Sequence, residues 1–249
     1  MEFGGKVVIV TGATSGIGMA TTLKFAAEGG QVAAVGRRKE TLSRLEKNNV
    51  RTYAADLLNE KETQNLVANV LRDFGGIDIL VNAAGIIASG TIENTTLADY
   101  DLMMNINVRS VFHLMQLALP SIIERKGNIV NVSSVTGLRA FPGVLAYCVS
   151  KAAVDQLTRC AAMELAAKGV RVNAVNPGVV RTNLHRNSGM NEESYAGFLE
   201  RSKGTHPLGR VGEPEEIADF ILFLASSKAG WITGTTQSID GGRAQTCAR

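Results

Sequence analysis

Short runs of apolar, mostly β-branched residues alternate along the chain with longer segments in which apolar residues recur at helical spacing. The short runs predict strands at residues 6–10, 31–36, 50–56, 77–82, 128–134, 170–178 and 235–242. The longer segments predict helices at residues 15–30, 39–49, 59–76, 97–126, 144–167 and 214–227. Strands that alternate with helices over short connections favour one α/β domain spanning residues 1–249. Its core would be a doubly wound parallel sheet of about seven strands with helices on both faces.

Composition and charge narrow the class of protein. The chain has 249 residues, of which 45% are hydrophobic and 20% are charged, as in a globular protein with a sizeable core. Its formal net charge of +3 is too small to indicate a nucleic-acid partner. The first residues show no signal-peptide pattern, and no apolar run is expected to span a membrane. Cys148, Cys160 and Cys247 show no metal-binding or disulfide spacing and favour a reducing compartment, the cytoplasm.

A glycine-rich turn, VTGATSGIGMA, follows the first predicted strand. Gly12, Gly16 and Gly18 allow a sharp turn and a close approach of the backbone to a pyrophosphate. The helix that begins there would direct free N–H groups at the phosphates. Such a turn could equally be a plain connection, but its place at the first strand–helix junction favours dinucleotide binding. The predicted cofactor contacts in this turn are Gly12, Thr14, Ser15, Gly16, Ile17 and Gly18.

The second strand ends in AVGRRKE, where dinucleotide-binding folds often place an acid that holds the ribose. Arg37 lies 19 residues beyond Gly18, and Arg38 follows it, so two guanidiniums stand where an acid is expected. Cations at a helix start oppose the helix dipole, and local helix stability therefore does not explain them. Because arginine donors match a 2′-phosphate, we predict NADP(H) rather than NAD(H). The alternative is a solvated basic patch.

A candidate catalytic group opens the helix predicted at 144–167. Tyr147 and Lys151, in YCVSK, are four residues apart and share one helix face. A free tyrosine has a pKa of about 10. A nearby lysine ammonium, or the positive ring of an oxidised nicotinamide, is expected to lower that pKa so that the phenol can exchange a proton near neutral pH. Ser134, 13 residues before Tyr147, could donate to a substrate oxygen, and on composition alone Ser133 could do the same.

Five motifs in order give the chain a resemblance to the single-domain short-chain dehydrogenase/reductase family over essentially its whole length. They are TGATSGIG, NAAG at 82–85, NIN around Asn107, YCVSK, and NPG at 176–178. Ala83 stands where a second asparagine is commoner in the family. The chain is most similar in character to 3-oxoacyl-carrier-protein reductases and small carbonyl reductases. The resemblance implies a Rossmann fold and a homotetramer.

The resemblance also implies a role for each matching residue. Ser134, rather than Ser133, would hold the substrate oxygen, and Tyr147 would transfer the proton. Lys151 would bind the nicotinamide ribose, and Asn107 would anchor a water molecule in a proton relay. The further cofactor contacts that it implies are Asp56, Leu57, Asn82, Ala83, Gly85, Tyr147, Lys151, Pro177, Gly178, Val179, Val180 and Thr182.

The predicted function is that of an oxidoreductase, which transfers hydride between NADP(H) and a small carbonyl or alcohol substrate, as a carbonyl or 3-oxoacyl reductase. An NAD-dependent alcohol or hydroxysteroid dehydrogenase and a non-enzymatic NADP(H)-sensing regulator are the alternatives. Residues 183–212 are polar and lack apolar periodicity, which predicts an irregular, mobile lid. This lid and residues 137–144 would set substrate specificity. No metal site is predicted, because the histidines have no ligand spacing: His113, His185 and His206.

Overall fold

The computed structural model describes residues 1–246, so Cys247 lies outside the described residues. Its strands are β1 (Val7–Thr11), β2 (Gln31–Gly36), β3 (Val50–Ala54), β4 (Ile79–Asn82), β5 (Asn128–Val132), β6 (Arg171–Pro177) and β7 (Thr236–Ile239). They form one parallel sheet in the order β3-β2-β1-β4-β5-β6-β7. The predicted doubly wound sheet is confirmed. The winding reverses between β1 and β4, the kind of position where open α/β sheets bind ligands.

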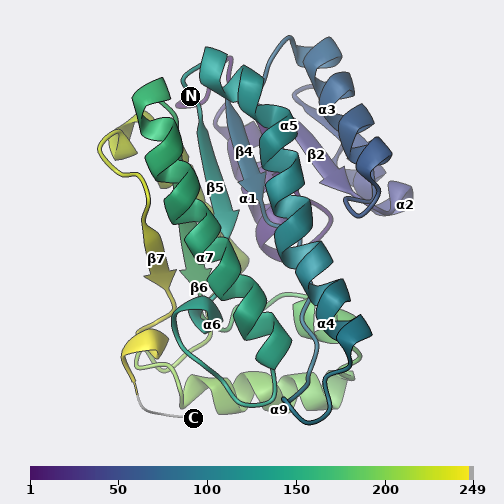
Figure 1. Ribbon diagram of the computed structural model, residues 1–249, viewed down its shortest axis with the longest axis vertical. Coiled ribbons are helices and arrows are strands. Elements are labelled where there is room, and N and C mark those ends of the chain that lie inside the picture. Colours follow the sequence, from purple (N-terminus) through teal and green to yellow (C-terminus); the bar gives the residue numbers. More distant parts are fainter. Residues whose placement is uncertain (247–249) are drawn as a thin grey trace.

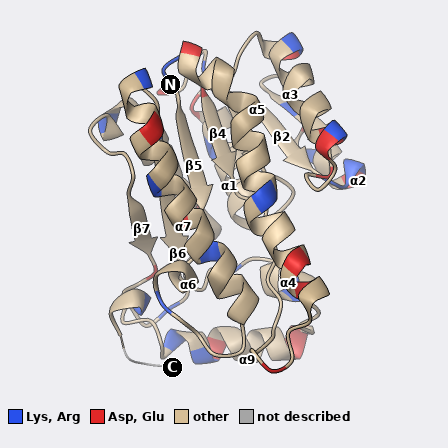
Figure 2. Cartoon of the chain, viewed as in Figure 1, with Lys and Arg blue, Asp and Glu red and all other residues tan. Residues whose placement is uncertain are grey.

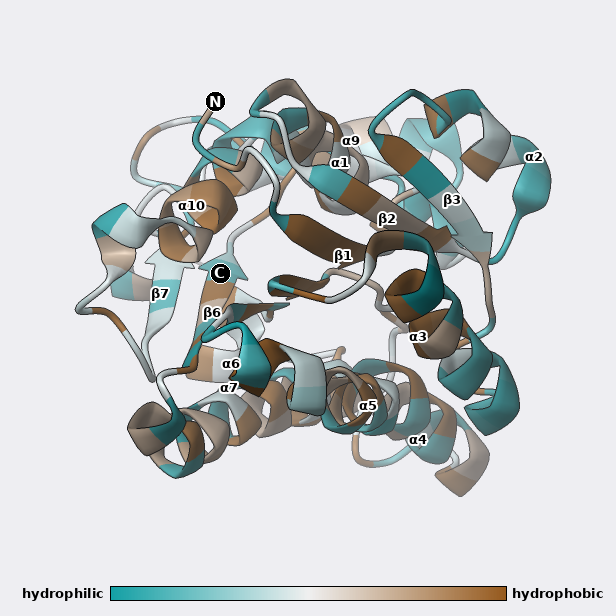
Figure 3. Cartoon of the chain, turned by 90° about the horizontal axis from the view of Figure 1, so that it is seen from above, coloured by the Kyte–Doolittle hydropathy of each residue, from teal (hydrophilic) through white to brown (hydrophobic). Residues whose placement is uncertain are grey.

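Helices cover both faces of the sheet (Figures 1 and 3). Their bounds are α1 (Gly16–Ala27), α2 (Lys39–Leu42), α3 (Glu60–Phe74), α4 (Leu97–Met104), α5 (Ser110–Glu124), α6 (Val135–Leu138), α7 (Leu145–Leu165), α8 (Leu184–Asn187), α9 (Glu192–Lys203) and α10 (Pro214–Ala225). α1 and α10 lie on one face, and α3, α5 and α7 lie on the other. Successive strand residues point to opposite faces, so Ile9 packs in the core under α3 and α5, whereas Val8 and Val10 pack in the core under α1 and α10.

Residues 183–212 are not irregular, contrary to the prediction. They contain α8 and the 12-residue helix α9, which crosses below the carboxyl ends of the strands (Figure 1). Asn191 caps α9 by accepting a hydrogen bond from a backbone N–H of the first turn at 2.8 Å. Tyr195 and Leu199, four residues apart, are buried against Val211. Two buried apolar positions are too few to show as a helical period in the sequence.

The helix predicted at 97–126 consists of α4, a five-residue π-helical segment (Asn105–Arg109) and α5. By length and composition alone, the 28-residue run Leu97–Glu124, which contains an 18-residue window with a mean hydropathy of 1.2, is long and apolar enough to cross a membrane. The core helix of a globular protein passes the same test, and polar residues such as Asp101, Asn107 and Arg109 interrupt this run, so it does not contradict the expectation from the sequence. In the fold, parts of this run contact β4, α3 and α7, as a helix that covers a sheet does.

The basic helix predicted at 39–49 is much shorter in the structure. α2 ends at Leu42 and passes into a 3₁₀ turn, Ser43–Leu45. Asn49 then donates from its side chain to two backbone carbonyl groups at the end of α1, at 2.8 and 3.0 Å, which draws the chain away from a helical path. The other short 3₁₀ turns are Ala166–Lys168, Ser227–Ala229 and Arg243–Gln245.

Candidate active site

A cavity of about 1030 Å³ opens at the carboxyl ends of the central strands. Its walls come from the turns after β1, β2, β4, β5 and β6, from the start of α7, and from α8 and α9. It gathers most of the predicted site residues: Gly12, Thr14, Ser15, Gly16, Ile17, Gly18, Arg37, Arg38, Asp56, Leu57, Ala83, Gly85, Ser134, Tyr147, Lys151, Pro177, Gly178, Val179, Val180 and Thr182. A parallel sheet brings such distant segments together because all its strands end at one edge.

The turn between β1 and α1 leaves no room for side chains. Gly12 has a φ of 67°, and a Cβ added to it would lie 2.9 Å from the carbonyl oxygen of Ala83. A Cβ on Gly18 would overlap the carbonyl oxygen of Gly12. Ser15, the N-cap of α1, makes no side-chain cap, so the first-turn N–H groups stay free of a capping group beside the cavity. This turn therefore fits a pyrophosphate.

The end of β2 brings two guanidiniums to the same cavity. Arg37 and Arg38 are exposed, and within residues 1–246 neither side chain has a hydrogen-bond or ion-pair partner. Basic residues are visible around α2 (Figure 2). A Cβ on Gly36 would lie 2.7 Å from the methyl group of Thr14, so a side chain there would press on the glycine turn. Among the described residues that line the cavity, Asp56 is the one carboxylate.

Tyr147, Lys151 and Ser134 meet in one wall of the cavity. The Tyr147 and Lys151 side chains are buried, and the Lys151 Nζ lies 5.7 Å from the centroid of the Tyr147 ring. The same Nζ donates to the carbonyl oxygen of Val132 at 2.9 Å. Burial raises the pKa of Tyr147 to about 12, while a hydrogen bond with Ser134 acts in the opposite direction. Burial lowers the pKa of Lys151 to about 8, and the charge of Asp155 opposes that shift.

For the groups that the chain itself supplies, the pKa of Tyr147 is raised and not lowered, contrary to the direction that the sequence predicts. Removing the phenol from water disfavours the phenolate, and this effect outweighs the hydrogen bond with Ser134, which acts in the opposite direction. Tyr147 is therefore held in its protonated form at neutral pH, which is the form that can donate a proton.

The two serines after β5 have different partners. Ser133 donates to the carbonyl oxygen of Lys151 at 3.1 Å and also hydrogen-bonds Asp155. Both serines line the cavity, but Ser134 is the one that hydrogen-bonds Tyr147. Since the hydroxyl of Ser133 is engaged in the protein interior, Ser134 is the serine that meets the tyrosine at the cavity.

Asp155 is a buried polar residue that sequence reasoning missed. It is 1% exposed, and burial raises the pKa of its carboxyl group. Asn176 donates from its side-chain amide to both carboxyl oxygens of Asp155, at 3.1 and 2.9 Å, and to the carbonyl oxygen of Ser134 at 2.9 Å. These bonds fix the backbone behind the cavity wall. The signal in the sequence is the spacing of Tyr147, Lys151 and Asp155, four residues apart on one face of α7.

Two predicted site residues lie behind the wall and do not line the cavity. Asn82 donates to the side-chain oxygen of Asn131 at 2.9 Å, which joins β4 to β5. Asn107, in the π-helical segment, is 1% exposed. Its Oδ1 accepts the Ile86 N–H at 2.9 Å, and its Nδ2 donates to the Ile86 carbonyl oxygen and the Ser150 hydroxyl at 3.0 Å each. Both asparagine side chains therefore hold the wall in place.

His206, for which the sequence indicates no role, joins α9 to the turn after β6. The imidazole is 3% exposed. Its Nδ1 lies 2.7 Å from the carbonyl oxygen of Ser202, and its Nε2 accepts the Val179 N–H at 3.1 Å. Because a carbonyl oxygen can only accept, Nδ1 carries the hydrogen. Val179 lines the cavity, so the ring fixes part of its wall.

Replacing His206 by alanine is expected to lower the free energy of unfolding by about 1–3 kcal/mol, because the Val179 N–H and the Ser202 carbonyl lose their partner in a buried place. His206→Gln keeps one donor and one acceptor and is expected to recover part of this loss. Urea unfolding of both variants measures the difference. An alanine variant as stable as the original protein would contradict this role for the imidazole.

The parallel sheet, the turn after β1 and the cavity at its carboxyl edge define a Rossmann-type, dinucleotide-binding α/β protein. A family model described as enoyl-(acyl carrier protein) reductase matches residues 12–244. The chain is 41% identical to the 3-oxoacyl-[acyl-carrier-protein] reductase FabG of Thermotoga maritima, over 97% of this chain and 99% of that protein. It is 38% identical to the L-xylulose reductase of Mus musculus, over 96% of each.

A solved structure of a short-chain dehydrogenase/reductase of unknown function from Caenorhabditis elegans, with cofactor, has a TM-score of 0.93 at 35% identity, and covers 99% of this chain and 97% of that one. The chain belongs to the short-chain dehydrogenase/reductase family, as the motifs predict. It is an oxidoreductase of the class that acts on CH–OH or C=O groups with a nicotinamide cofactor.

Proposed function

We propose that this protein is an NADPH-dependent reductase of small carbonyl or 3-oxoacyl compounds. The observation that carries the proposal is the meeting of Tyr147, Ser134 and Lys151 in one wall of the cavity, where Ser134 hydrogen-bonds the protonated phenol. A group held in its acid form is suited to protonate an oxygen as hydride reaches the adjoining carbon. The names of two relatives, a 3-oxoacyl reductase and a xylulose reductase, agree with this direction.

In this mechanism the polar groups of the wall act on one substrate oxygen. A bound nicotinamide dinucleotide supplies or accepts the hydride. Ser134 donates a hydrogen bond to the carbonyl oxygen and polarises it, and Tyr147 gives its proton to the same atom. Lys151 binds the nicotinamide ribose, and its ammonium stabilises the phenolate that forms. The amide hydrogens of Asn107 are taken by Ile86 and Ser150, so the relay water that restores the proton of Tyr147 would be held through the second acceptor position of the Asn107 Oδ1.

The choice of NADP(H) over NAD(H) is supported by the charges at the end of β2. Arg37 and Arg38 have no partner within the described part of the chain, and both line the cavity. A guanidinium binds a phosphate through charge-assisted hydrogen bonds. We therefore place the 2′-phosphate at these arginines, the pyrophosphate at the glycine turn, the adenine near Asp56, and the nicotinamide near the turn 177–182.

The test is the oxidation of NADPH and of NADH by the purified protein with a series of ketones and 3-oxoacyl thioesters. Turnover that is faster with NADPH is expected. Binding of NADPH without reduction of any substrate would instead favour a regulator that senses the cofactor. A preference for NAD⁺ with alcohols or hydroxysteroids would favour the dehydrogenase alternative.

We also propose that residues 183–212 act as a lid, although they contain helices. α8 and α9 contribute Leu184 and Phe198 to the cavity. Trypsin is expected to cleave first within this segment, at Arg186 or Arg201, because these basic side chains lie on two of its helices and lids open more readily than the core. NADPH with a substrate should slow that cleavage. A cleavage rate that does not change with ligand would count against a lid.

We also propose that the protein forms a homotetramer and lies in the cytoplasm. Between Ser110 and Ile123, α5 carries no charged residue, and its ribbon is mostly tan in Figure 2. Large apolar side chains are exposed on α4, α5 and α7, namely Leu97, Leu102, Phe112, Val149 and Met163. Further copies of the chain would cover such a surface. The location is supported by the free thiols of Cys148 and Cys160, which suit a reducing compartment.

A further inference from the structure

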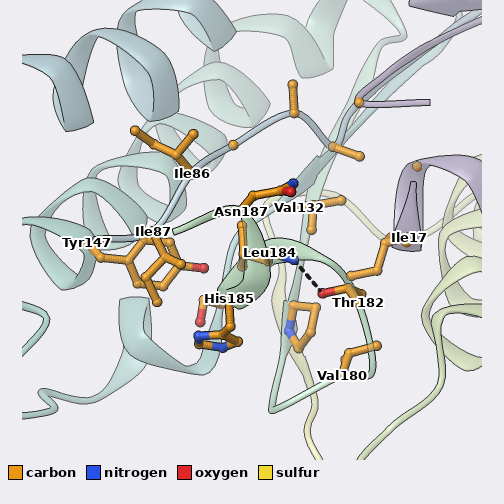
Figure 4. Close-up of a pocket in the computed structure, with 18 of the residues that line it drawn as sticks. Ile17, Ile86, Ile87, Val132, Tyr147, Val180, Thr182, Leu184, His185 and Asn187 are labelled. Carbon is orange, nitrogen blue, oxygen red and sulfur yellow. Dashed lines mark hydrogen bonds between the residues drawn. The ribbon is translucent and has the colours of Figure 1, made fainter. Parts of the chain in front are cut away.

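The part of the cavity next to Tyr147 has mainly apolar walls (Figure 4). The apolar side chains there are Ile86, Ile87, Phe141, Val144, Leu184 and Phe198. His185, from α8, lines the same cavity as Tyr147 and Ile87, and Figure 4 shows the three side chains. One cavity therefore holds both the Tyr147 phenol and the imidazole of His185.

The His185 ring is fixed in position but has no polar partner. It is half-buried, and its centroid lies 4.4 Å from that of the Phe198 ring, which supports one side of the imidazole. Within residues 1–246 neither ring nitrogen makes a hydrogen bond. Burial lowers the pKa of His185, so the ring is neutral at pH 7 and offers one donor and one acceptor.

The polar side chains near His185 are already hydrogen-bonded within the protein or exposed to solvent. The hydroxyls of Ser188 and Ser202 donate to the backbone carbonyls of His185 and Phe198, at 2.7 Å each. Asn187 and Arg201 are exposed to solvent. A substrate that covers the ring displaces water from its nitrogens, and a ligand atom that pairs with one of them avoids the cost of leaving it unpaired.

We infer that His185 hydrogen-bonds a second oxygen of the substrate. The favoured substrates would be carbonyl compounds with a hydroxyl or carbonyl oxygen on the first or second carbon beyond the reacting carbonyl. This inference rests on the proposed reductase function. With the reacting oxygen at Tyr147 and Ser134, an unsubstituted chain would leave the imidazole desolvated and unpaired, whereas an oxygenated chain would pair with it. A neutral imidazole gives no ionic attraction, so His185 by itself does not select a carboxylate.

Two matched pairs of ketones test the inference. In each pair the chains have the same number of atoms and one member lacks the oxygens beyond the reacting carbonyl: butan-2-one lacks the hydroxyl of 3-hydroxybutan-2-one, and heptan-2-one lacks both ester oxygens of ethyl 3-oxobutanoate. The original protein is expected to show a kcat/KM about threefold to tenfold higher for the oxygenated member of at least one pair, which is the usual effect of one hydrogen bond.

His185→Phe keeps an aromatic ring beside Phe198 and removes both ring nitrogens. It should lose the preference mainly through slower reduction of the oxygenated ketone, while its affinity for NADPH and its melting temperature stay close to the original values. His185→Gln restores a donor and an acceptor and should recover part of the preference.

The outcomes separate this inference from the function on which it rests. If the original protein reduces no ketone with either nucleotide, the reductase function itself fails. If it reduces ketones but shows no preference in either pair, or if His185→Phe keeps the preference unchanged, the role of His185 is wrong and the reductase function stands.

Discussion

Substituting phenylalanine for Tyr147 is expected to lower kcat at least about a hundredfold, the usual scale for the loss of a general acid. The phenol is 6% exposed, hydrogen-bonded to Ser134 and held protonated by burial. Phenylalanine fills the same space, so the wall should keep its shape while the proton donor is lost. Steady-state reduction of a ketone with NADPH measures the change in kcat.

Binding of NADPH to the Tyr147→Phe variant, followed by fluorescence, is the control. Affinity for the cofactor should change little, because the glycine turn and the arginines are untouched. A matched substitution of the other aromatic residue with a buried hydroxyl, Tyr195→Phe, removes a hydrogen bond to the carbonyl oxygen of Thr182 at 2.8 Å. That variant should retain far more activity. Near-normal turnover in Tyr147→Phe would refute the proton-donor assignment.

Replacing Arg37 by alanine is expected to reduce kcat/KM for NADPH by about one to two decades and to leave the value for NADH nearly unchanged. A 2′-phosphate carries nearly two negative charges at neutral pH. A hydrogen bond to such a group is worth about 1.5–3 kcal/mol, which corresponds to that range. Arg37 follows directly on Gly36 at the end of β2, and we therefore expect it to contribute more than Arg38.

Arg44→Ala is the matched control for this experiment. Arg44 is exposed but does not line the cavity, and its substitution by alanine removes the same charge as Arg37→Ala does. The control should leave both kcat/KM values close to those of the original protein, whereas Arg38→Ala should have a smaller effect than Arg37→Ala. An original protein that prefers NADH would overturn the NADP(H) proposal, and the arginines would then be a solvated basic patch.

The sequence alone was enough for the strands and most of the helices. Buried strands such as β1 appear as unbroken apolar runs because helices cover both faces of a parallel sheet. The order of strands and helices then restricts the topology to a doubly wound sheet. The glycine turn could also be predicted from the sequence. Few residue types other than glycine tolerate the φ of 67° at Gly12, where a Cβ would meet a neighbouring carbonyl group.

Only the tertiary structure decided how individual polar groups are used. Ser133 and Ser134 are adjacent and chemically identical, and their partners differ because successive residues at a strand end point in different directions. Asp155 and His206 carry no motif, and their importance follows from partners more than 20 residues away in the chain.

The pKa of Tyr147 shows the same division between sequence and structure. The four-residue spacing of Tyr147 and Lys151 correctly predicts that they share one helix face. Whether the pKa of the phenol is raised or lowered, however, depends on how much water the group loses on folding. α9 escaped prediction for a related reason, because its stability comes from two residues packed against a distant segment. Local patterns fix the elements and the backbone turns, whereas hydration and pairing depend on neighbours that only the folded chain brings together.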